Sequence, residues 1–287
     1  VFAPAYKDSD MEELVTLCDH VIFNSFAQYV RHRKKVAAQN VASGTEHRVS
    51  IGLRINPEWS TQDGHDIYDP CAPGSRLGTT REQWNALMTE EWKSLIDGLH
   101  FHTLCEQDAD DLATTLQAVE TTFGDILPQM KWLNMGGGHH ITRPGYHMDI
   151  LEDCIRTAQQ KWGVQVYLEP GEACALHAGY LATRVLDVLT NGNTKIAIVD
   201  TSAACHMPDV LEMPYRPPLL GAADETTENE VTVRLGGPTC LSGDIIGDYK
   251  FNKLPEYGDL LLFGDMAIYT TCKNNTFNGM PLPDIWI

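Results

Sequence analysis

The first 175 residues alternate between short apolar runs and longer amphipathic stretches, and this alternation constrains the fold more than any other feature of the chain. Most of the apolar runs are rich in Val, Ile, Leu or Phe, which is typical of strands buried on both faces. Strands that alternate with helices predict a parallel sheet with right-handed crossovers. Six such units fit either an open doubly wound sheet or most of an eight-stranded barrel. The runs occupy residues 1–5, 21–24, 49–55, 98–102, 132–135 and 164–168.

Two stretches between these runs have the periodicity of amphipathic helices. Residues 108–123 place Leu112, Leu116, Val119 and Phe123 along one helical face, with acidic residues in the first turn. Residues 148–162 repeat the same apolar pattern. Both stretches are therefore predicted to be helices that connect strands.

After about residue 175 the pattern changes. Strand-like runs are separated by turns that contain proline or glycine, and little helical periodicity remains. These runs are 180–189, 195–200, 231–235 and 259–263. The sequence therefore predicts two domains, a (β/α) domain over 1–175 and a mostly antiparallel β domain over 176–287.

The net negative charge of the chain favours some classes of binding partner over others. Lys and Arg number 21 against 39 Asp and Glu, which gives a net charge of −18. An acidic surface repels phosphate backbones and attracts cations such as polyamines, so a nucleic-acid partner is disfavoured.

No run approaches the roughly 18 apolar residues of a membrane span, which argues against a membrane protein. The eight cysteines include no CxxC pair, so a zinc ribbon has no support and reduced cytoplasmic thiols are expected.

Three glycines, at positions 136 to 138, leave the predicted strand at 132–135. Glycines let a backbone bend sharply and bring N–H groups close to an anion, which suggests a phosphate site. Three glycines alone, however, fit a tight turn without a ligand better.

Two further strands end in polar side chains. Glu169 follows the run at 164–168, and the carboxyl ends of parallel strands form the functional face of such folds. A buried carboxylate needs a partner, either a protonated pyridine nitrogen or a neighbouring Arg. His100 and His102 lie on the same face of a third strand, where they could hold a metal, lay one imidazole against a flat cofactor, or be core residues.

Two residues of the β domain could also act on a ligand. Cys240 lies in a glycine-flanked loop and could donate a proton or act as a nucleophile, although composition alone favours an inert buried cysteine. Tyr269 could reach a phosphate with its hydroxyl or simply pack in a core.

A glycine loop, an acid at a strand end and an imidazole together fit pyridoxal phosphate, whose ring needs a carboxylate to stay protonated.

These motifs, in this order, resemble the fold III (alanine racemase-type) family of pyridoxal-phosphate decarboxylases, which contains ornithine and diaminopimelate decarboxylases. The resemblance is strongest to its carboxynorspermidine (carboxyspermidine) branch and covers essentially the whole chain. It implies a (β/α)8 TIM-type barrel followed by the β domain. Six ordered segments are far more specific than any one of them, and they are 75–78, 100–102, 135–140, 168–172, 237–244, and Tyr269 with 276–279.

The resemblance implies a site for pyridoxal 5'-phosphate and no metal. One imidazole would stack on the cofactor ring, an acid would pair with the pyridine nitrogen, and the glycines and a tyrosine would hold the phosphate from two sides. In that order, the residues are His102, Glu169, Gly136, Gly137, Gly138 and Tyr269.

The resemblance also implies a cytoplasmic homodimer with shared active sites. Cys240 would come across a head-to-tail interface and protonate the carbanion left after CO₂ departs, and Asp244 would lie near the substrate amine. The reaction would convert carboxynorspermidine or carboxyspermidine into norspermidine or spermidine. Ornithine and diaminopimelate decarboxylases typically carry Arg at the position of Glu172, so this acid suits a cationic carboxy-polyamine, with Asp209 as the other best substrate contact.

The family's Schiff-base lysine lies on the first barrel strand, and none of the ten lysines here occurs in that motif. The six predicted strands would then be strands three to eight, with the N-terminal strands and the lysine missing from this chain. Three alternatives stay open: a catalytically inactive homologue that acts as a binding module, a diaminopimelate- or ornithine-type decarboxylase, and a metal-dependent hydrolase barrel using His100 and His102.

Overall fold

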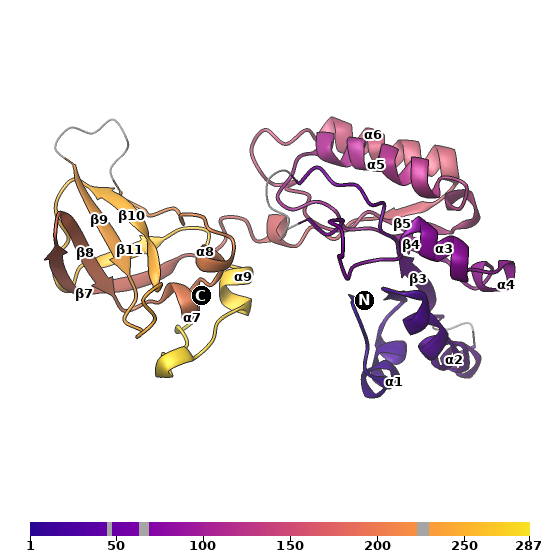
Figure 1. The fold of residues 1–287 in the computed structure, drawn as a ribbon, viewed down its shortest axis with the longest axis horizontal. Helices are drawn as coiled ribbons and strands as arrows, with labels where there is room; N and C mark the ends of the chain where they lie inside the picture. Colours follow the sequence, from indigo (N-terminus) through magenta and orange to yellow (C-terminus); the bar gives the residue numbers. More distant parts are fainter. Residues whose placement is uncertain (45–47, 63–68, 223–229) are drawn as a thin grey trace. The chain divides into compact units, whose positions relative to one another are not determined.

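The computed structural model describes residues 1–44, 48–62, 69–222 and 230–287. These residues form two compact units, Val1–Ala173 and Cys174–Ile287 (Figure 1). The division lies two residues before the one expected from the sequence. None of the helices in the described ranges is long and apolar enough to cross a membrane.

The first unit contains a sheet of six parallel strands whose spatial order follows the sequence from β1 to β6. A doubly wound sheet reverses its strand order at a switch point. The uninterrupted order therefore excludes that alternative and gives part of a barrel. The strands are β1 (Phe2–Ala3), β2 (His20–Phe23), β3 (Ser50–Arg54), β4 (Gly98–His100), β5 (Trp132–Asn134) and β6 (Gln165–Tyr167).

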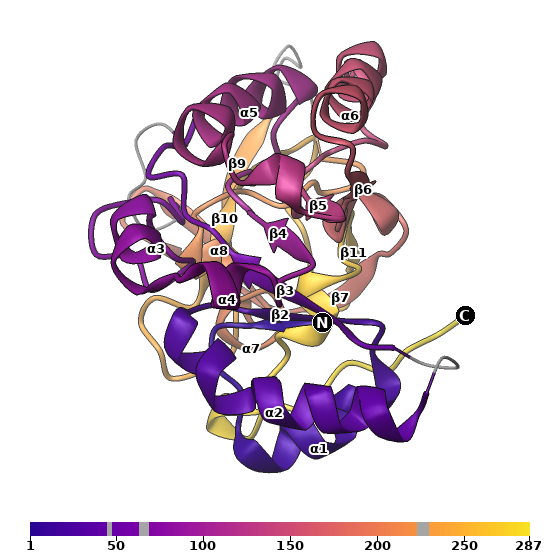
Figure 2. The same ribbon diagram turned by 90° about the vertical axis from the view of Figure 1, so that its right-hand side faces the viewer.

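The helices of this unit lie around the outside of the strands (Figure 2). The two predicted helices are confirmed, and α6 spans the predicted residues. Asp108 is the N-cap of α5 because its carboxylate accepts a bond from Ala109 N, and Gly163 ends α6 in a left-handed conformation. The helical elements are α1 (Asp8–Leu17), α2 (Phe26–Ala42), α3 (Arg81–Leu87), α4 (Glu90–Lys93), α5 (Ala109–Phe123), η1 (Leu127–Gln129) and α6 (Met148–Trp162).

Trp132, the first residue of β5, packs against the beginnings of the neighbouring strands β3 and β4. Its indole covers Gly98, where an added Cβ would lie 2.0 Å from the ring, and also reaches Gly52. Its Nε1 donates to Ser50 Oγ at 2.9 Å. The two glycines pair with each other across β3 and β4, and Gly98 pairs with Trp132 across β4 and β5. This contact helps to fix the register in which the opposite ends of the strands present their side chains.

The second unit contains a five-stranded sheet in the order β10-β9-β8-β7-β11. Only β8 and β9 run parallel among its neighbouring pairs, so the predicted mostly antiparallel sheet is confirmed. The strands are β7 (Leu181–Asn191), β8 (Thr194–Val199), β9 (Val231–Gly236), β10 (Ile245–Phe251) and β11 (Leu260–Phe263). The short helices are η2 (Glu172–Cys174) at the boundary between the units, α7 (Ala203–His206), α8 (Asp209–Glu212), α9 (Tyr269–Cys272) and η3 (Phe277–Gly279).

Candidate active site

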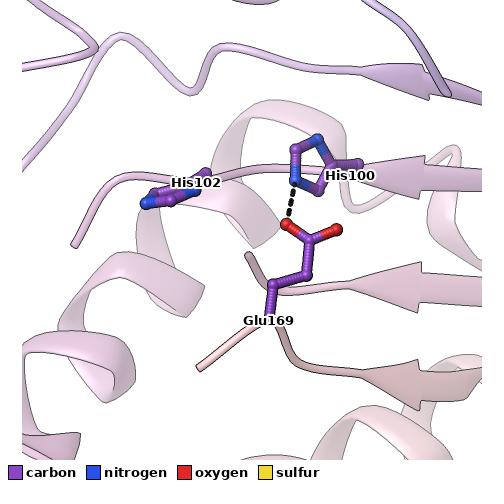
Figure 3. Close-up of side chains that lie close together, drawn as sticks. All are labelled: His100, His102 and Glu169. Atoms are coloured by element: carbon purple, nitrogen blue, oxygen red, sulfur yellow. Dashed lines mark ion pairs between the residues drawn. The ribbon is translucent and has the colours of Figure 1, made fainter. Parts of the chain in front are cut away.

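The carboxyl ends of β4, β5 and β6 bring three polar side chains together. His100 is the last residue of β4 and pairs in register with Asn134, the last residue of β5. Asn134 in turn pairs with Tyr167 of β6, two residues before Glu169. The site therefore follows from strand register, and Figure 3 shows the Glu169 carboxylate directed at the His100 ring.

His100 holds one side of the Glu169 carboxylate. The His100 Nε2 lies 3.3 Å from Glu169 Oε2, and the imidazole is fully buried. Burial lowers the pKa of His100, so its ring is neutral near pH 7. The contact with His100 is also the main cause that lowers the pKa of Glu169 to about 2, with a contribution from Asn134. Glu169 is accordingly a fixed negative charge across the physiological pH range.

Asn134 links Glu169 to the glycine loop. Its Nδ2 donates to Glu169 Oε1 at 2.8 Å, and its Oδ1 accepts from Gly136 N at 2.9 Å. The Glu169 N–H also donates to Gly136 O at 2.8 Å. One buried amide thus ties the strand-end acid to the loop, a role that the sequence analysis missed.

The glycine loop has a conformation that other residues would not adopt. Gly136 and Gly138 have φ values of +72° and +80°. An added Cβ would lie 2.4 Å from Phe101 O at Gly136 and 2.5 Å from Glu169 O at Gly137. Within the described ranges, the N–H groups of Gly137 and Gly138 donate to no other group of the chain. These free donors form a concave backbone site that suits an anion.

His102 lies next to this loop and is also uncharged at neutral pH. Burial is the main cause that lowers its pKa to about 4, and the nearby Arg54 adds to the shift. Arg54 is itself buried and donates from Nη2 to His102 O at 2.9 Å. Its guanidinium also lies 4.7 Å from the centre of the Phe2 ring. The His102 backbone is therefore held in place, and its neutral ring can stack against a flat ligand.

The low pKa of His102 predicts a loss of stability in acid. A histidine in the unfolded chain takes up a proton near pH 6.5, whereas His102 in the folded chain stays neutral down to about pH 4. The unfolded state therefore binds more protons in this range, and the free energy of unfolding should fall by about 2 kcal/mol between pH 7 and pH 5 through this residue. Chemical denaturation of the cofactor-free protein should show a smaller fall for His102→Gln than for the wild type. Equal falls would contradict the shifted pKa.

Glu172 begins η2, three residues after Glu169. Its Oε1 lies 3.8 Å from Nε2 of the buried His140, the second residue after the glycine loop. The Thr142 hydroxyl donates to Ala173 O at 2.5 Å and joins the same two segments. The structure thus places Glu172 close to the glycine loop, and its role as a substrate contact stays a prediction.

The family model described as "Pyridoxal-dependent decarboxylase, C-terminal sheet domain" matches residues 17–267. The chain belongs to this family. The carboxynorspermidine/carboxyspermidine decarboxylase of Campylobacter jejuni is 39% identical over 100% of this chain and 73% of its own length. The carboxyaminopropylagmatine decarboxylase of a Synechocystis species is 42% identical over 99% of this chain and 70% of its own length.

A solved structure supports the same assignment. The crystal structure of carboxynorspermidine decarboxylase from Campylobacter jejuni, complexed with norspermidine, is 39% identical and has a TM-score of 0.80. It is matched over 98% of this chain and 72% of that chain. The predicted decarboxylase family, and the fold of parallel barrel strands followed by a mostly antiparallel sheet, are confirmed. The pyridoxal-dependent family also implies a pyridoxal phosphate cofactor.

The remaining predicted site residues of this decarboxylase lie in its second unit. Cys240 is an exposed residue of the loop between β9 and β10, and Tyr269 is a half-exposed residue at the start of α9. Asp209, the first residue of α8, pairs with Lys273, whose ammonium also lies 3.3 Å from Glu212 Oε2. Asp244 is buried. The roles of these residues stay predictions.

Among the residues that the structure describes, two groups of side chains have the composition of metal sites. His100, His102 and Glu169 each offer a ligand atom, and these atoms lie within 4.8 Å of one another. Asp108, Asp110 and His147 form a second such group. Two neutral imidazoles and a carboxylate are a common set of zinc ligands in hydrolases. The first group is therefore the place where the metal-dependent hydrolase alternative can be tested. In the second group, Asp108 already caps α5 and accepts from His147 N at 3.0 Å.

Proposed function

We propose that the protein decarboxylates carboxynorspermidine or carboxyspermidine to norspermidine or spermidine, with pyridoxal phosphate as cofactor. The observation that carries this proposal is the Glu169 carboxylate, held ionised beside a glycine loop with free N–H donors. The relatives of known activity that match the whole chain support the substrate class.

The residues of the first unit fit pyridoxal phosphate. The free N–H groups of Gly137 and Gly138 would bind the phosphate, and the neutral His102 ring would stack on the pyridine. Glu169 would pair with the ring nitrogen and keep it protonated, while Tyr269 would also bind the phosphate. When bound, the cofactor supplies a protonated ring that accepts the electron pair left when CO₂ departs.

Residues of this chain would complete the reaction. The Cys240 thiol, which is exposed on the loop between β9 and β10, would give its proton to the carbon that has lost CO₂. We propose that Cys240 acts across the interface of a cytoplasmic homodimer with shared active sites.

The predicted substrate acids would select a cationic polyamine chain. Glu172 is the first candidate, because it lies beside the glycine loop and its side chain is partly exposed. Asp209 is the second, and there a substrate ammonium would take the place of Lys273. Asp244 is the third, although its side chain is buried.

The carboxyaminopropylagmatine decarboxylase relative favours a second candidate substrate of similar chemistry. At 42% identity it is as similar to this chain as the carboxynorspermidine/carboxyspermidine decarboxylase relative. Its named substrate is likewise a carboxylated aminopropyl amine, but one that ends in a guanidinium group. The two candidates differ in the group at the far end of the substrate, so measuring CO₂ release from both compounds distinguishes them.

Glu172→Gln should raise the KM of the full-length enzyme for carboxynorspermidine by at least tenfold. A charge-assisted hydrogen bond from a substrate ammonium is worth about 1.5–3 kcal/mol, or about 10–150-fold in affinity. The substitution keeps the shape of the side chain and removes its charge, so cofactor absorbance should be unchanged. Steady-state CO₂ release measures the effect, and Glu152→Gln on the exposed face of α6 is the matched control. An unchanged KM would assign the amine contact to Asp209 or Asp244.

A further inference from the structure

We propose that Asp244 and Asn278 are positioning residues that hold Cys240 from its two sides. This inference rests on the proposed role of Cys240 as proton donor. It also gives Asp244 a role other than the substrate contact expected from the sequence. The supporting contacts all lie within the second unit.

Asp244 is the buried anchor of the Cys240 loop. Its side chain is 2% exposed, and each of its oxygens accepts two hydrogen bonds. The Oδ2 atom accepts from the Thr239 hydroxyl at 2.6 Å and from Thr239 N at 3.3 Å, next to Cys240 in the chain. The Oδ1 atom accepts from the Ser202 hydroxyl at 3.0 Å and from Ala204 N at 3.3 Å. A substrate amine could reach this carboxylate only by displacing these donors, which favours a positioning role.

The backbone of the loop is built around this carboxylate. Gly237 N donates to Asp244 O, and Asp244 N donates to Leu241 O, both at 2.9 Å. A Cβ at Gly237 would lie 2.2 Å from Asp244 Oδ2, so a larger residue there would displace the carboxylate. The loop is thus closed on itself, with Cys240 exposed to solvent.

Asn278 holds Cys240 from the other side. Its Oδ1 accepts from Cys240 N at 3.0 Å. The residue has a φ of +56°, a left-handed conformation that Asn adopts more readily than most residues other than Gly. The side chain that contacts Cys240 is therefore projected from a backbone position that few residues could occupy.

The segment that carries Asn278 is anchored on α7. Asn275 donates from N to Cys205 O at 3.0 Å and from Nδ2 to Ala204 O at 2.9 Å. His206 Nε2 lies 2.9 Å from Pro281 O, and a carbonyl can only accept, so this nitrogen carries the hydrogen. Ser202, which bonds Asp244, is the N-cap of the same helix. The contacts form a closed ring that runs from Cys240 through Asn278 and α7 to Asp244 and back.

Two substitutions test the contact between Asn278 and Cys240, and they separate the effect of backbone conformation from the effect of the hydrogen bond. Asn278→Gly keeps the left-handed backbone and removes the acceptor, whereas Asn278→Asp keeps both. Asn278→Gly should speed hydrogen exchange at the Cys240 amide about fivefold, the factor that corresponds to one hydrogen bond of about 1 kcal/mol. It should lower kcat by a similar factor with KM unchanged, and Asn278→Asp should restore both. Asn193→Gly, in the exposed turn between β7 and β8, is the matched control.

Thr239→Val and Thr239→Ser test the hydrogen bond from the Thr239 hydroxyl to Asp244 in the same way. The valine keeps the shape and removes the hydroxyl donor, while the serine retains it, so only Thr239→Val should lower kcat. The proposal is overturned if Asn278→Gly and Thr239→Val leave kcat at the wild-type value, or if they raise KM instead. Absence of turnover in the wild-type full-length protein would overturn the proposed function itself. Exchange at the Cys240 amide does not depend on turnover and still reports whether Asn278 holds the loop.

Discussion

Cys240→Ala should lower kcat of the full-length enzyme by about 10²–10⁴-fold, the usual contribution of general acid catalysis. The reason is that the thiol is proposed to supply the proton in the step after CO₂ leaves, and an alanine has none to give. KM should change much less, because the side chain is not proposed to bind the substrate. Steady-state CO₂ release measures both constants. A rise in KM with kcat unchanged would instead make Cys240 a binding residue.

The proposed sharing of sites adds a second test of Cys240. Cys240→Ala and Glu169→Ala subunits would be inactive separately, but a mixed dimer would contain one site with both residues intact. Random exchange makes half of the dimers mixed, each with half of its sites active, so about a quarter of the wild-type activity should return. No recovery in dimers that exchange freely would contradict a site shared between subunits.

Glu169→Gln should lower kcat by about 10²–10³-fold, similar to the loss of other preorganised electrostatic partners in active sites. The amide keeps the size of the side chain but cannot hold a proton on the ring nitrogen. The wild-type carboxylate has a pKa of about 2, so the charge that is lost is present throughout the working pH range.

The matched control for Glu169→Gln is Glu82→Gln in the exposed first turn of α3. Cofactor binding, followed by absorbance, should survive in Glu169→Gln, because the glycine loop still binds the phosphate. A kcat close to the wild-type value would contradict the pairing of Glu169 with the ring nitrogen.

The sequence predicted the parallel strands and the helices α5 and α6 because their signals are local. Strand β10 was missed because its apolar alternation is interrupted. The pairing register shifts between Ile245 and Gly247, and a bulge of this kind moves the following side chains to the other face. The buried residues Ile246 and Tyr249 are therefore three positions apart instead of two.

The site was predicted only where a residue carries its own signal. The glycines, Glu169 and His102 belong to recognisable motifs. Asn134 acts through a contact with Glu169, 35 residues away, which depends on strand register and cannot be read from its neighbours. The bond between Asp244 and Ser202 likewise joins residues 42 positions apart. Sequence patterns show which acids are present, but their partners depend on the fold.

The selectivity of CO₂ release by the full-length protein, with pyridoxal phosphate supplied, tests the central claim most directly. The kcat/KM for carboxynorspermidine, carboxyspermidine and carboxyaminopropylagmatine would be compared with that for diaminopimelate and ornithine. We predict that one of the carboxylated aminopropyl amines is preferred over both amino acids by at least about 100-fold, or about 2.7 kcal/mol. Metal analysis of the same preparation should find no stoichiometric zinc. A preference for diaminopimelate or ornithine, or pyridoxal phosphate binding without CO₂ release from any of the five compounds, would contradict the account.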